Sequence, residues 1–169
     1  MRPIQYLFES VSGGGSVHSK IGVELQQMWQ KELGIKVELR QMEKQVYLAA
    51  KRWLDYDVSR STWIGDYNDP NTFLDLFRSN NGNNRTGWKH KPYDDLMDRA
   101  SLLTDLNKRA ELLRQAESIL VRDEAPIAPL YFYSGFNYHN PEHITGIHGN
   151  VLDSHPIKVI RVRKNNDPK

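Results

Sequence analysis

The chain has 169 residues, contains no cysteine and carries a formal charge of +2 at neutral pH. A chain of this length can bury one hydrophobic core, which predicts a single domain over residues 1–169, and its nearly balanced charge argues against nucleic-acid binding. The lack of cysteine excludes disulfides, thiol catalysis and cysteine metal sites. With no apolar segment of roughly 20 residues and no apolar signal segment at the start, the chain should not insert directly into a membrane.

The first third of the chain alternates strand and helix patterns. Alternating residues predict a strand over residues 4–9, and a helix with apolar residues on one face then runs from an N-cap at Ser16 to Gly34. A strand at 35–40, a helix at 43–54 and a strand at 56–63 follow. This order predicts an α/β fold, a mixed sheet flanked by helices, in which the strand ending at Trp63 is internal.

A rigid polar turn follows the third predicted strand. Gly65 and the run Asn68-Asp69-Pro70 end the strand and present polar groups outward. Asp69 is a favoured N-cap and Pro70 suits a first helical turn, so a short helix is expected over residues 70–77. We name residues 63–70 the elbow.

The second half is predicted to be mainly helical. Residues 78–90 hold a run of asparagine and glycine that is typical of a surface loop. Helices are then expected from Pro92 and from a cap at Thr104, and together they should form a helical hairpin. A strand is expected at 127–133, and its proline, Pro129, places it at a sheet edge or marks the beginning of the strand. Residues 140–169 are looser, with a final strand near 157–162.

Several motifs that could indicate a cofactor or catalysis are incomplete. Residues 13–15 are all glycine, but the lysine and the third glycine of nucleotide-binding loops are missing. A calcium-loop-like start in the elbow fails at Pro70. His139 and His143 are separated by Pro141, which argues against a helix that would bring both to one zinc ion. No nucleophile motif stands out. We therefore predict no cofactor, no metal and no catalytic residue.

Three residues around the elbow have the chemistry of a binding site for a zwitterion such as a peptide. Arg60 can bind an anion through two hydrogen bonds, Trp63 offers a stacking surface and Asp66 offers a carboxylate, on a segment whose backbone could pair with an extended guest. Strand residues alternate between faces, so the three can line one cleft only if the chain bends near Gly65 or if both faces of a strand edge border the cleft. For Asp69 a capping role is favoured.

The elbow and the residues after it, Trp-Ile-Gly-Asp-Tyr-Asn-Asp-Pro-Asn-Thr-Phe-Leu, resemble a signature of extracytoplasmic solute-binding proteins of family 5, the peptide-binding proteins of bacterial ABC importers. Residues 25–37, 56–58 and 125–131 resemble other stretches of that family. The resemblance implies one lobe of a type II periplasmic-binding-protein fold, in which two α/β lobes close over the ligand.

The resemblance also implies a role for each candidate residue. Asp66 would hold the α-amino group of the peptide, Arg60 would lie near its carboxylate or side chains, and Trp63 would line a side-chain pocket. The backbone of Thr62 and Ile64 would pair with the peptide.

Other implications of the resemblance concern the whole protein. Lys51 falls where some relatives place a basic residue for the peptide C-terminus. Family members are several hundred residues long, so this chain would be a C-terminal lobe whose N-terminal lobe is missing. Its partners would be a peptide ligand and the membrane subunits of an ABC permease, in the periplasm or another extracytoplasmic compartment.

Three alternatives remain open. A relative of the same family could carry a non-peptide cargo, such as a nickel chelate or a sugar. A small hydrolase could use Asp66 or Asp69 as a base. The chain could also pair with a separate chain that supplies the missing lobe. The favoured interpretation is a non-enzymatic binding module for peptides.

Overall fold

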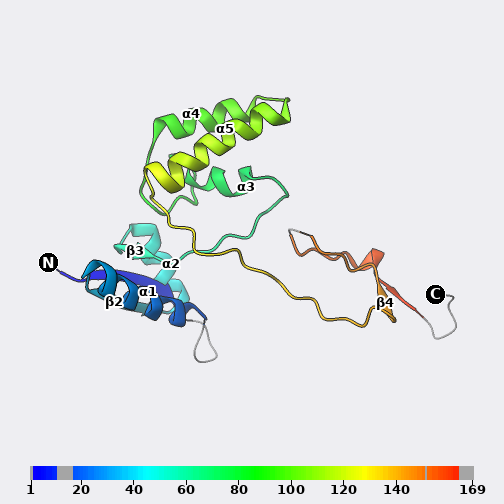
Figure 1. Ribbon diagram of the computed structural model, residues 1–169, viewed down its shortest axis with the longest axis horizontal. Helices are drawn as coiled ribbons and strands as arrows, with labels where there is room; N and C mark the ends of the chain where they lie inside the picture. Colours follow the sequence, from blue (N-terminus) through cyan, green and yellow to red (C-terminus); the bar gives the residue numbers. More distant parts are fainter. Residues whose placement is uncertain (1, 11–16, 151, 164–169) are drawn as a thin grey trace. The chain divides into compact units, whose positions relative to one another are not determined.

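The computed structural model describes residues 2–10, 17–150 and 152–163 of the chain (Figure 1). These residues form two compact units: unit 1 comprises Met1–Trp63 and Asn80–Lys89, and unit 2 comprises Ile64–Ser79 and His90–Lys169. The expectation that all 169 residues act as one domain stays a prediction. The predicted cap at Ser16 and the glycines at 13–15 lie outside the described residues.

Unit 1 is an α/β layer around a parallel sheet. Strand β1 pairs with β2 on one side and with β3 on the other, and both pairings are parallel. Helix α1 connects β1 to β2, and helix α2 connects β2 to β3, which confirms the predicted alternation. The bounds are β1 Ile4–Glu9, α1 Val17–Leu33, β2 Val37–Met42, α2 Lys44–Trp53 and β3 Val58–Ser59.

The central strand β1 is buried on both faces because helices cover both. On one face, Tyr6 and Phe8 form a buried cluster with Val37. The α1 residues Leu25 and Trp29 pack against this cluster. On the other face, Leu7 is fully buried beside two α2 residues, Tyr47 and Ala50. The two-residue side-chain repeat of a strand accounts for this division. It also holds both helices against the sheet that carries the basic candidate residues.

The third strand differs from the prediction. It is limited to Val58–Ser59, and one further hydrogen bond, from the Arg60 N–H to the Leu7 carbonyl at 2.9 Å, extends the pairing. Within the described residues β3 is an edge strand, so the predicted internal strand ending at Trp63 is wrong. The strand-like composition near Trp63 reflects exposed side chains: Ile64 is 80% exposed, and such residues gain little from pairing in a sheet.

Unit 2 is built on a helical hairpin, as predicted. Helices α4 and α5 lie side by side, with α3 beside them (Figure 1). Tyr93, Met97 and Ala100 from α4 form the core with Leu113 and Ala116 from α5. The α5 N-cap is Asp105 rather than the expected Thr104. The bounds are α3 Asn71–Leu74, the 3₁₀ helix η1 Asp75–Phe77, α4 Lys91–Ser101, α5 Leu106–Ser118 and the π-helical turn η2 Ile119–Asp123.

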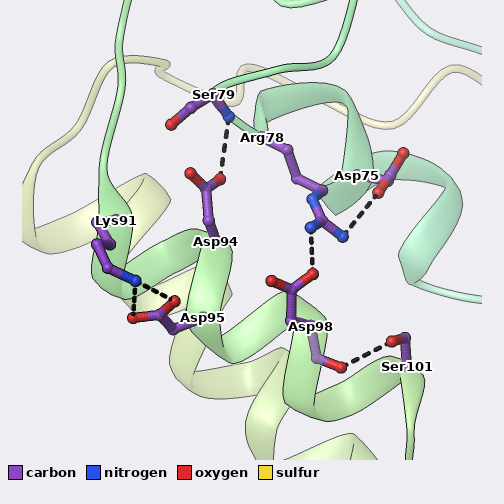
Figure 2. A network of polar contacts seen from close by, with 8 residues as sticks. All are labelled: Asp75, Arg78, Ser79, Lys91, Asp94, Asp95, Asp98 and Ser101. Atoms are coloured by element: carbon purple, nitrogen blue, oxygen red, sulfur yellow. Dashed lines mark hydrogen bonds and ion pairs between the residues drawn. The ribbon is translucent and has the colours of Figure 1, made fainter.

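A network of charged side chains fastens the segment after α3 to helix α4 (Figure 2). Arg78 bonds to the Asp98 carboxylate, and Asp75 lies 3.8 Å from the same guanidinium. Asp94, in the first turn of α4, accepts a hydrogen bond of 3.0 Å from the Ser79 N–H. Asp94 thus holds the preceding loop, and its negative charge also favours the helix dipole at this end of α4.

The end of the chain contains less regular structure. Strands β4 (Ile144–Thr145) and β5 (Arg161–Val162) form an antiparallel pair, and a 3₁₀ helix η3, Ile157–Val159, precedes β5. The strand predicted at 127–133 has no partner among the described residues, so that prediction is wrong for this part of the chain. The segment is extended and exposes its aromatic side chains, with Phe132 99% exposed. None of the helices described has the length and apolar character required to cross a membrane.

Candidate functional site

The basic candidate residues of unit 1 lie at the carboxyl end of its sheet. Arg60 follows β3 directly, and its carbonyl accepts a hydrogen bond from the Tyr47 hydroxyl on α2. Lys51, one turn further along α2, donates a hydrogen bond of 2.9 Å to the Ser61 hydroxyl. In the strand order β2-β1-β3, the connection that leaves β1 leads to β2 on one side of β1, and the next connection leads to β3 on its other side. Such a switch point, at the carboxyl ends of the strands, is where open α/β sheets bind ligands.

The electrostatics of this edge favour an anion. Burial lowers the pKa of Lys51, and the nearby positive charges of Arg85 and Arg60 lower it further. The Lys51 ammonium also lies 5.2 Å from the centre of the Tyr47 ring. The Glu9 carboxylate acts in the opposite direction, but it is one negative charge beside three cations. The arrangement can therefore still receive the negative end of a ligand.

His18 belongs to the same edge and was missed in the sequence. It lies in the first turn of α1, and within the described residues its buried Nδ1 atom has no hydrogen-bond partner. Burial lowers the pKa of His18 and the positive charge of Arg60 lowers it further, whereas Glu9 acts in the opposite direction.

The backbone around Trp63 is available for pairing. In the part of the chain that the structure describes, neither Thr62 nor Ile64 forms a backbone hydrogen bond. The Trp63 side chain is 40% exposed, so a partly open aromatic surface accompanies free donors and acceptors. That this backbone pairs with a peptide and that Trp63 lines a side-chain pocket stay predictions.

Unit 2 begins at Ile64 and carries the acidic candidate, Asp66. Its carboxylate is exposed and forms no hydrogen bond or ion pair with any described residue, whereas its N–H donates to the Thr72 hydroxyl at 2.9 Å. Thr72 is only 4% exposed. A Cβ atom on Gly65 would lie 3.2 Å from both Thr72 and Phe73, a tight contact that would force one of these side chains to shift by a few tenths of an ångström. The backbone is anchored while the carboxylate stays open to a ligand.

Asp69 caps the turn that leads into α3, but the N-cap of this helix is Pro70 rather than the predicted Asp69. Its carboxylate accepts a hydrogen bond of 2.8 Å from the Asn71 N–H at the start of α3. It also pairs with Arg109 of α5, a residue that no motif in the sequence singled out.

The candidate residues are therefore divided between the two units. Lys51, Arg60, Thr62 and Trp63 belong to unit 1, and Ile64 and Asp66 belong to unit 2. The expectation that Arg60, Trp63 and Asp66 line one cleft stays a prediction. Among the described residues no three histidine, aspartate or glutamate side chains are grouped to hold a metal ion.

Comparison with known proteins relates this geometry to a family. Residues 4–85 match the model for bacterial extracellular solute-binding proteins, family 5 Middle. The chain is 48% identical over 118 residues to the oligopeptide-binding protein OppA of Bacillus subtilis. This match covers 69% of this chain and 22% of the relative. It is 41% identical over 130 residues to the dipeptide-binding protein DppE of the same organism, covering 77% of this chain and 24% of the relative.

A solved structure gives the same result. The Escherichia coli murein tripeptide binding protein MppA matches with a TM-score of 0.81 and 30% sequence identity, over 96% of this chain and 31% of that chain. This similarity confirms the expected fold, one lobe of a type II periplasmic-binding protein. The chain spans 22% and 24% of the lengths of the two curated relatives.

Proposed function

Because the chain belongs to the bacterial extracellular solute-binding proteins of family 5, we propose that it is part of the substrate-binding component of a peptide ABC importer. The relatives named above are described as binding oligopeptides, dipeptides and a murein tripeptide, which supports a peptide as the ligand. The proposed role is binding without catalysis. The permease subunits, a further lobe and an extracytoplasmic location belong to the same proposal.

The observation that carries the proposal is the exposed Asp66 carboxylate on an anchored backbone. A carboxylate left without a protein partner can accept hydrogen bonds from the ammonium group at the start of a peptide. The anchoring of its N–H by buried Thr72 limits how far the carboxylate can move. A site that is held in place before binding loses less entropy when the ligand arrives.

The remaining candidates fit the other parts of a peptide. Lys51 and Arg60, at the carboxyl edge of the sheet, match a carboxylate at the peptide C-terminus or on a side chain. The backbone of Thr62 and Ile64, which has no hydrogen-bond partner among the described residues, matches an extended guest that adds to a strand edge, and Trp63 matches a side-chain pocket.

Affinity of this chain alone should be low. Exposed ion pairs contribute about 0–1 kcal/mol, whereas enclosed charge-assisted hydrogen bonds contribute about 1.5–3 kcal/mol. Two such contacts left in water would reduce affinity by at least a factor of roughly 100. We therefore expect dissociation constants no tighter than about 100 μM for the 169-residue chain.

The test is an NMR titration of the 169-residue chain with alanine peptides of two to five residues, each with a free or an acetylated amino terminus. Free-amine peptides should shift the Asp66 amide signal, acetylated peptides should shift it much less, and Asp66→Asn should abolish the difference. Asp123→Asn, which removes an exposed carboxylate that pairs with the adjacent Arg122, is the control. Equal responses to both kinds of peptide, or none, would overturn the proposal and direct the search to a non-peptide cargo.

A further inference from the structure

We propose that Arg109 is a positioning residue for the ligand-binding carboxylate of Asp66, acting through Asp69. This inference rests on the proposed function, since it concerns how the carboxylate that receives the ligand amine is aimed. Arg109 lies on α5, forty residues after Asp69, and both belong to unit 2.

The contact between Arg109 and Asp69 has the geometry of a strong ion pair. The two guanidinium nitrogens donate to the two carboxylate oxygens, Nη1 to Oδ2 at 2.7 Å and Nη2 to Oδ1 at 2.8 Å. Both side chains are mostly covered, with 21% and 31% of their surfaces exposed. A planar, two-bond contact fixes direction as well as distance, which a lysine ammonium cannot do.

A short series of hydrogen bonds connects this ion pair to Asp66. The Asp69 carbonyl accepts from the Thr72 N–H at 3.1 Å, and the Thr72 hydroxyl accepts from the Asp66 N–H at 2.9 Å. The Asp69 N–H in turn donates to the Tyr67 carbonyl at 2.9 Å. Asp69 is thus bonded to residues on both sides of the turn, and Arg109 holds Asp69 against α5.

The ion pair also decides which carboxylate of the elbow is open to a cation. The hydrogen bonds from Arg109 are the main cause that lowers the pKa of Asp69, and they raise the pKa of Arg109. Asp69 therefore stays ionised but already has a cationic partner. Asp66, three residues earlier, has none among the described residues. Loss of Arg109 would leave two competing carboxylates on a looser turn.

The experiment compares Arg109→Met and Arg109→Lys with the wild-type 169-residue chain. Arg114→Met is the matched control, because Arg114 lies on the same helix but pairs locally with Glu111. In Arg109→Met the Asp66 amide should exchange its hydrogen about tenfold faster, the change expected when about 1.4 kcal/mol of local stability is lost. Arg109→Lys should fall between Met and wild type, and Arg114→Met should match wild type.

Peptide binding supplies a readout that general destabilisation would not move. The ratio of dissociation constants for N-acetyl-trialanine and trialanine measures how well the amine is recognised. This ratio should fall at least threefold in Arg109→Met, whereas simple loss of folded protein would weaken both peptides equally and leave the ratio unchanged. Circular dichroism verifies that the helices remain folded in Arg109→Met. If they do not, the same two measurements on Arg109→Lys test the positioning role.

The outcomes separate the two proposals. If the wild-type chain discriminates the peptides and Arg109→Met keeps both the ratio and the slow exchange at Asp66, the positioning role is wrong and the proposed function stands. If the wild-type chain shows no amine-dependent response while Arg109→Met accelerates exchange at Asp66, the proposed function fails although Arg109 still fixes the turn.

Discussion

The Lys51 ammonium donates a hydrogen bond of 2.9 Å to the Ser61 hydroxyl. The contact joins helix α2 to the segment that follows β3 and keeps a cation at the carboxyl edge of the sheet. Burial and the charges of Arg85 and Arg60 lower the pKa of Lys51, against the opposite influence of Glu9. The protein holds this positive charge at a cost in folding free energy, as expected of a surface that receives an anion.

This cost predicts a pH-dependent effect of Lys51→Met. Between the lowered pKa of folded Lys51 and the ordinary lysine value, the unfolded chain binds more protons than the folded chain. Wild-type stability should therefore rise with pH through that window, relative to the variant. Lys51→Met should have a higher free energy of unfolding than wild type. This difference should be largest at neutral pH and become smaller in alkaline solution. Urea unfolding followed by circular dichroism measures it, with Lys31→Met as the control for loss of an exposed charge. A difference that does not change with pH would contradict the prediction.

The helices of the fold could be predicted because their signals are local. Apolar residues at helical spacing predicted α1, α2, α4 and α5, and Gly34, with a φ of 65°, ends α1 as its position suggested. Strand pairing is not local. The residues at 127–133 and around Trp63 have strand-like composition, but a strand forms only where a partner strand lies beside it.

The candidate site divides in the same way. Asp66, Arg60 and Trp63 could be selected from their chemistry within one short segment. His18 and Arg109 could not, because the charge of Arg60 that acts on His18 and the carboxylate of Asp69 that pairs with Arg109 both come from residues far away in the chain. In the sequence, an arginine that pairs with the elbow looks the same as any other arginine on the polar face of a helix.

Tyr93→Phe should destabilise unit 2. Tyr93 is fully buried, and its hydroxyl donates a hydrogen bond of 2.6 Å to the Leu74 carbonyl at the end of α3. Phenylalanine would leave that carbonyl without this donor inside the core, which costs about 1–3 kcal/mol in free energy of unfolding. Urea unfolding followed by circular dichroism measures the loss. Tyr138→Phe, at a tyrosine that is 92% exposed, should change stability by less than about 0.5 kcal/mol. An equal effect of both variants would contradict the assigned role.

Gly65→Ala should disturb the elbow without unfolding the protein. The added Cβ would lie 3.2 Å from the Thr72 methyl group and 3.2 Å from the Phe73 ring. Phe73, which is 42% exposed, can move, but Thr72 is buried and holds the Asp66 N–H. We expect faster hydrogen exchange at Asp66 and weaker recognition of peptide amines, with little change in melting temperature. Gly82→Ala, where no atom lies within 4 Å of the added carbon, should leave all three unchanged.

Acid titration should reveal the Asp69 ion pair directly. Because the folded pKa of Asp69 is lowered, chiefly by the hydrogen bonds from Arg109, the unfolded chain binds more protons between that pKa and the ordinary aspartate value. The stability that the pair contributes is therefore complete above the ordinary value and is lost as pH falls through the lowered one. The Asn71 amide donates to Asp69 at 2.8 Å, so its NMR chemical shift reports the protonation of this carboxylate. Its midpoint should lie below the ordinary aspartate range in wild type and in Arg114→Met, and should move upward in Arg109→Met. A midpoint that is the same in all three proteins would show that Arg109 does not hold Asp69 in solution.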